Sequence, residues 1–100
     1  MNTTQKNILA EAAFLEQMIN EGKWSFVRST LDDLAAWADE LKPNHKVWLE
    51  NMISQFERLR GLRAVNHMYE PAFDDKLVNQ IAMQLADKLK DFATYCFTKD

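Results

Sequence analysis

Residues 24–41 read WSFVRSTLDDLAAWADEL, and this stretch decides the fold. Apolar side chains recur in it at intervals of three and four residues, which places them on one face of an α-helix. The opposite face is charged and includes Arg28 and Asp32. A helix with this pattern buries one face only, so it needs other helices to cover that face. The apolar positions are Trp24, Val27, Leu31, Leu34, Ala38 and Leu41.

Three other segments have the same helical periodicity. They are separated by Gly22, by Pro43 and by the stretch from residue 61 to 71, because glycine and proline interrupt helices. The sequence therefore predicts an all-α fold, a single-domain bundle of four main helices over residues 1–100. The helices are expected at about 4–21, 24–41, 45–60 or longer, and 74–97.

Length and composition exclude several other classes. A chain of 100 residues is one domain, and it has room for one core but not for a two-domain enzyme. Its two glycines leave few positions for tight hairpin turns or for glycine-rich phosphate-binding loops. A β-rich fold is therefore disfavoured.

The third helix changes its buried face along its length. Apolar residues from Trp48 to Leu59 share one face, but Leu62, Val65 and Tyr69 project more than roughly 100° away from it. A straight helix cannot bury both sets, so the pattern predicts a kink or a break near Gly61, or a second docking surface beyond it.

The fourth helix has a broader apolar arc, which suits packing on two neighbours. Its members are Leu77, Val78, Ile81, Ala82, Leu85, Ala86, Leu89, Phe92, Ala93 and Cys96.

Charge and cysteine content restrict partners and location. A net charge of −3 makes non-specific nucleic-acid binding unlikely, because such binding depends on a basic excess. The lone Cys96 cannot form an intrachain disulfide, which fits a reducing compartment and predicts a cytoplasmic protein. The apolar runs are too short for a membrane span of about 20 residues.

Catalytic and metal-binding patterns are weak. His45 and His67 lie at opposite ends of the third segment, so they predict no catalytic dyad. His67, Glu70 and Asp74 could approach one another as metal ligands, but an exposed interhelical turn is the simpler interpretation. Cys96 reads as an inert thiol in an apolar arc. We expect no enzymatic activity, no metal and no cofactor.

Arg58, Arg60 and Arg63 form the main basic run. They are consistent with a solvated helix end, and also with a site that grips a phosphate or an acidic partner. The leading hypothesis is a small non-enzymatic module that docks on another protein as an adaptor, inhibitor or chaperone-like regulator. In size and class it resembles accessory regulators of bacteria and phages. The expected contact residues are Arg58, Arg60, Leu62, Arg63, Val65, Tyr69 and Phe73.

Two alternatives stay open. Homodimerisation through the same surface is the closest variant, because a short chain gains core by pairing. The other is a helical protein that binds nucleic acid or a nucleotide through Arg58, Arg60 and Arg63, with Lys46 as a further contact.

Overall fold

The computed structural model describes residues 3–69 and 76–95, with side chains for 3–64 and 76–95. The described chain is all-α. Its elements in order are α1 (Thr3–Asn20), the 3-10 turn η1 (Trp24–Phe26), α2 (Val27–Ala38), α3 (Pro43–Tyr69) and α4 (Lys76–Tyr95). The predicted four-helix bundle is confirmed.

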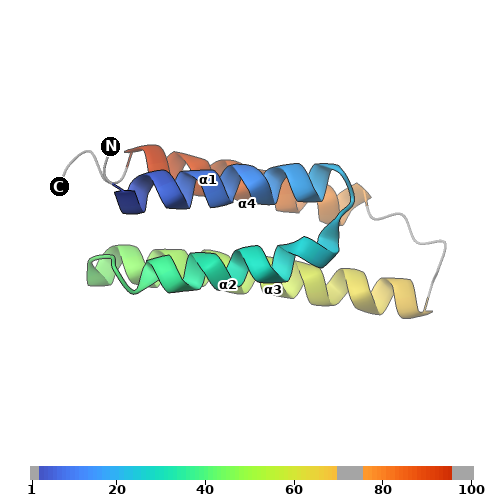
Figure 1. The fold of residues 1–100 in the computed structure, drawn as a ribbon. Helices are drawn as coiled ribbons and strands as arrows, with labels where there is room; N and C mark the ends of the chain where they lie inside the picture. Colours follow the sequence, from blue (N-terminus) through green and yellow to red (C-terminus); the bar gives the residue numbers. More distant parts are fainter. Residues whose placement is uncertain (1–2, 70–75, 96–100) are drawn as a thin grey trace.

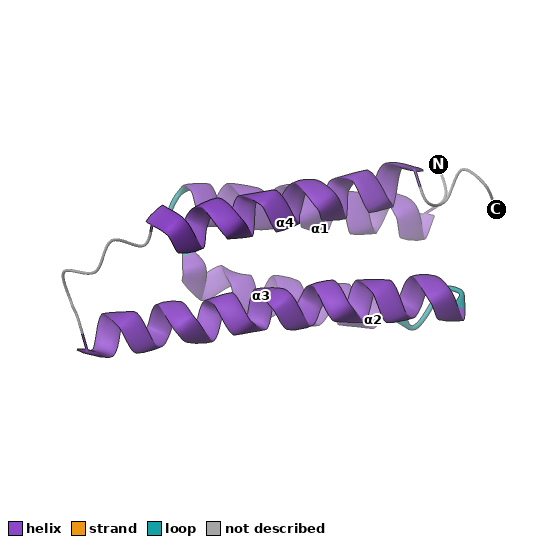
Figure 2. Ribbon diagram, turned by 180° about the vertical axis from the view of Figure 1, so that it is seen from behind, coloured by secondary structure: helices purple, strands orange, loops and turns teal. Residues whose placement is uncertain are grey.

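Successive helices run in opposite directions, and each packs on two neighbours (Figure 1). α1 packs most extensively on α4, and α2 packs on both α1 and α3. The contact between α3 and α4 closes the bundle and is the least extensive of the four helix pairs. Figure 2 shows the bundle from behind, and in this view α3 and α4 are the two helices nearest the viewer.

The core is built from the apolar faces that the periodicity predicts. Every helix contributes to it, and Phe56 is its largest fully buried side chain. Leu77 and Ile81, predicted to belong to the buried arc of α4, are instead exposed. The central buried residues are Ile8, Ala12, Leu15, Ile19, Val27, Leu31, Leu34, Leu49, Met52, Leu85 and Leu89.

The turn after α1 depends on Gly22. Its φ of 73° is a left-handed conformation that favours glycine. The N–H of Gly22 donates to the carbonyl of Ile19, and the N–H of Lys23 donates to that of Met18, at 3.1 and 2.8 Å. These two bonds form a Schellman motif, which satisfies carbonyls at the helix end and reverses the chain.

The second helix is shorter than predicted. The residues 24–26 form a 3-10 turn, and the α-helix ends at Ala38 rather than at Leu41. α3 then begins at Pro43, two residues before the predicted start. Proline is well suited to a first helical turn, because the N–H that it lacks has no partner there.

α3 continues without interruption through Gly61 to Tyr69, so the break offered as one outcome at Gly61 is absent. A single glycine costs a helix only about 1 kcal/mol, which the leucines, arginines and alanine around it can offset. A kink there stays a prediction. The apolar residues on the two sides of Gly61 differ in burial. Leu59 is buried, whereas half of the Leu62 side chain is exposed.

Polar contacts join the helices at the rim of the core. The buried amide of Gln5 donates to the carbonyl of Thr94, 3.3 Å away. The Lys90 ammonium lies 2.5 Å from the Glu16 carboxylate, and this pair joins α4 to α1. Hydrogen bonding to Glu16 raises the pKa of Lys90 above its ordinary value. Over 3–69 and 76–95, none of the helices combines the length and the apolar character that crossing a membrane requires.

Candidate functional site

The structure separates the predicted contact residues into two surfaces. Arg58 and Leu62 are exposed and lie one turn apart on α3. Arg60 and Arg63 lie on another flank of α3 and line a hollow beside α2. The three arginines therefore do not form one continuous basic surface.

The remaining predicted contacts are not described. Val65 and Tyr69 belong to the last turns of α3, but their side chains lie outside the described residues. Phe73 lies wholly outside them.

The first surface follows the contact between α3 and α4. The Trp48 ring stacks on Phe92, with centroids 4.3 Å apart and an interplanar angle of 15°. His45 meets the same Phe92 ring edge-on at 5.7 Å. These contacts fix which residues of the two antiparallel helices lie opposite each other.

The same register applies along the rest of the pair. Both helices advance about 1.5 Å per residue, so Leu62, fourteen residues after Trp48, is level with Val78, fourteen residues before Phe92. Leu77 and Ile81 flank Val78 and project toward the side of α4 that meets α3. The register therefore places Leu62 at about the same level along the helix pair as both of them.

Exposed apolar side chains concentrate along this contact. Among the described residues, eight large apolar side chains are exposed, and five of them lie on the sides of α3 and α4 that flank this contact. Leu77 and Tyr95 are the most exposed, at 64% and 65%. We call this set the α3–α4 surface: Trp48, Leu62, Leu77, Ile81 and Tyr95.

One end of the α3–α4 surface is hollowed. The hollow has a volume of about 320 Å³ and is lined by Trp48, Lys88, Asp91, Phe92 and Tyr95. Aromatic rings form most of its wall, and one charged group of each sign stands at its edge. A shallow apolar hollow of this kind can take one apolar side chain of a partner.

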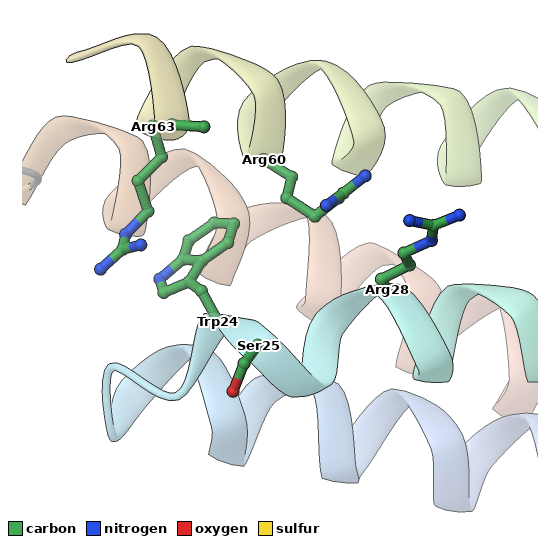
Figure 3. Close-up of a pocket in the computed structure, with 6 residues that line it drawn as sticks. Trp24, Ser25, Arg28, Arg60 and Arg63 are labelled. Atoms are coloured by element: carbon green, nitrogen blue, oxygen red, sulfur yellow. The ribbon is translucent and has the colours of Figure 1, made fainter. Parts of the chain in front are cut away.

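The second surface is a hollow of about 270 Å³ between the start of α2 and the second half of α3 (Figure 3). We call it the arginine hollow: Trp24, Ser25, Arg28, Arg60, Arg63 and Ala64 line it. The sequence interpretation missed Arg28, which it assigned to the solvated face of its helix. Trp24 and Arg28 are four residues apart, and in a continuous helix this spacing would place them on the same side.

Neighbouring groups hold two of these arginines in place. The Arg63 guanidinium lies 5.4 Å from the centroid of the Trp24 ring, a cation–π distance. Arg60 donates from both Nε and Nη2 to Oε2 of Glu57, each at 3.2 Å. Arg28 forms no ion pair with any described residue.

No group of three histidine, cysteine or carboxylate side chains that could hold a metal ion occurs within the described residues. The candidate ligands Glu70 and Asp74 lie outside those residues, as does the side chain of His67. That alternative therefore stays a prediction.

Comparison of the chain with protein-family models, with curated proteins and with solved structures gave no match.

Proposed function

We propose that this chain is a binding module, not an enzyme, and that its α3–α4 surface takes an amphipathic helix of a partner protein. The observation that carries the proposal is the concentration of exposed apolar side chains along one helix pair. Large exposed apolar patches on soluble domains commonly mark interaction sites.

The dimensions of the surface favour a helix as the occupant. Leu62, Leu77 and Ile81 lie at one end, and Trp48 with Tyr95 lies at the other. Trp48 and Leu62 are fourteen residues apart on α3, as are Ile81 and Tyr95 on α4, which corresponds to about 21 Å. A partner helix of four turns spans this length and can present apolar side chains to both ends. The 320 Å³ hollow beside Trp48 would take one of them.

Charge favours an acidic helix. Arg58 lies one turn from Leu62, and Lys88 lies on the same side of α4 as Ile81 and Tyr95. Neither cation forms an ion pair with a described residue. A partner with carboxylates beside its apolar stripe would pair with both, whereas a basic helix would meet only Asp91 at the hollow. An adaptor, an inhibitor or a chaperone-like regulator would all use such a surface.

The test uses a displayed library of amphipathic helical peptides that varies apolar anchors and flanking charge. Peptides selected on the wild-type chain are then measured against Leu62→Ser and Trp48→Ala. We expect each variant to weaken binding by roughly tenfold or more, because each removes an apolar contact at one end of the surface. Val47→Ser is the matched control, because Val47 is exposed on α3 beside Trp48 but is not part of the surface.

Two outcomes contradict the proposal. Equal binding by all three variants would place the peptide elsewhere. A dimer in light scattering that Leu62→Ser dissociates would show that a second copy of this chain, and not a partner helix, covers the surface.

A further inference from the structure

The arginine hollow gathers three cations from two helices in a protein of net charge −3. In Figure 3 the side chains of Arg28 and Arg60 extend from α2 and α3 toward the same part of the hollow. Arg63 lies on the other side of the Trp24 ring. An anion placed between Arg28 and Arg60 would thus meet cationic groups from both helices.

Glu57 pairs with Arg60, whereas Arg28 has no carboxylate partner among the described residues. Glu57 is engaged by Arg60, and its oxygen accepts both of the hydrogen bonds that the two residues form. Asp32 is one turn from Arg28 on α2, a spacing that permits an ion pair, but the two form none. Arg28 extends toward the hollow instead. Repulsion between guanidiniums that face the same space is relieved when an anion binds.

The wall of the hollow is already ordered. Trp24 is 5% exposed, and its indole N–H donates to Oδ1 of Asn79 at 3.1 Å, which fixes the ring against α4. Arg63 lies over that ring, and Arg60 is held by Glu57. Two of the three cations therefore lose little freedom when a ligand arrives, which favours binding.

The chemistry of the site selects phosphate. A guanidinium presents two parallel N–H groups that match the oxygens of a phosphate or a carboxylate. A phosphate monoester carries close to two negative charges at neutral pH, and so suits several cations better than a single carboxylate does. The buried ring of Trp24 offers no free face for a nucleobase, and a volume of about 270 Å³ suits a small ligand.

We propose that the arginine hollow is a binding site for a small phosphate-bearing ligand, with Arg28 and Arg60 as its main contacts. This site is separate from the α3–α4 surface and does not depend on the function proposed for that surface. The basic run in the sequence consists of Arg58, Arg60 and Arg63, whereas the arginines of the hollow are Arg28, Arg60 and Arg63.

The probe is inorganic phosphate, added at constant ionic strength and followed by two-dimensional ¹H–¹⁵N NMR. We expect a saturable shift of the Trp24 indole resonance, assigned with Trp24→Phe, at concentrations up to roughly 20 mM. Arg28→Gln and Arg60→Gln should each weaken binding by roughly tenfold or more, because each removes charged hydrogen bonds to the anion. Arg28→Lys should weaken binding less, because it keeps the charge but loses the forked geometry.

Arg58→Gln is the matched control, because Arg58 is an exposed arginine of the same helix that does not line the hollow. It should bind phosphate like the wild-type chain. Circular dichroism confirms that each variant is folded. The absence of a saturable shift, an equal loss in Arg58→Gln, or equal binding of acetate would each overturn the proposal.

Discussion

The indole N–H of Trp24 donates to Oδ1 of Asn79 at 3.1 Å and ties the turn η1 to α4, 55 residues away in the sequence. This bond satisfies the one polar atom of a ring that is almost fully buried. The ring is also the support over which Arg63 lies. The position of the arginine hollow thus depends on a contact with a helix that does not line it.

Asn79→Ala tests this contact. Without the amide, the indole N–H is buried with no acceptor, and the free energy of unfolding should fall by about 1–3 kcal/mol in urea denaturation. Gln80→Ala removes an exposed amide at the next position and should change stability by less than about 0.5 kcal/mol. Similar losses in both variants would mean that the bond contributes nothing specific.

The two glycines should respond to alanine with opposite signs. Gly22→Ala places a side chain at a φ of 73° and should lower the free energy of unfolding by about 1 kcal/mol. Gly61→Ala adds a Cβ in open space within α3 and should raise it by about 0.5–1 kcal/mol, because alanine favours the helix. Thermal unfolding of both variants measures the difference. A loss of stability in Gly61→Ala would indicate that α3 needs the glycine, as a kink there would require.

Phe56 and Leu62 test where burial along α3 ends. Phe56 is fully buried, so Phe56→Ala should cost about 3–5 kcal/mol. Leu62 is half exposed, and Leu62→Ala should cost less than about 1 kcal/mol. Chemical denaturation measures both. A large cost for Leu62→Ala would mean that this side chain belongs to the core and not to the α3–α4 surface.

Ionisation of Glu11 should lower the free energy of unfolding, so the contribution of this residue to stability should be more favourable in mild acid than at neutral pH. Partial burial, and then the charge of Asp33, raise the pKa of Glu11 above its ordinary value of 4.5. The folded chain thus holds this proton more tightly than the unfolded chain. The stabilisation from this group is fully present below the unfolded pKa and is lost as pH rises through the folded pKa.

Glu11→Gln removes that unfavourable charge. At pH 7 the variant should be more stable than the wild-type chain, by less than about 1 kcal/mol, and the difference should shrink as pH falls toward 4. Asp33→Asn removes the second cause and should recover part of the gain. Melting temperatures at several pH values measure both effects, and a loss of stability in Glu11→Gln at pH 7 would contradict the assignment.

Much of the architecture follows from local patterns in the sequence. Three- and four-residue spacing identified the helices and most of the core, from Ile8 to Leu89, because an amphipathic helix must bury its apolar face whatever covers it. Helix ends were less predictable. The tightening of residues 24–26 into a 3-10 turn depends on how the chain enters the bundle, and periodicity cannot report that.

The functional surfaces depend on which helices lie side by side. Leu77 and Ile81 belong to the apolar arc of α4 by spacing, but both are exposed in the bundle, where the contact between α3 and α4 is the least extensive of the four helix pairs. Arg28 reads as a solvated residue until the packing of α2 on α3 brings it beside Arg60, 32 positions later. Helical periodicity depends on local backbone geometry, so the sequence can assign each residue to a face of its helix. The neighbour that the face meets is set by packing between distant segments, so only the folded bundle reveals the two surfaces.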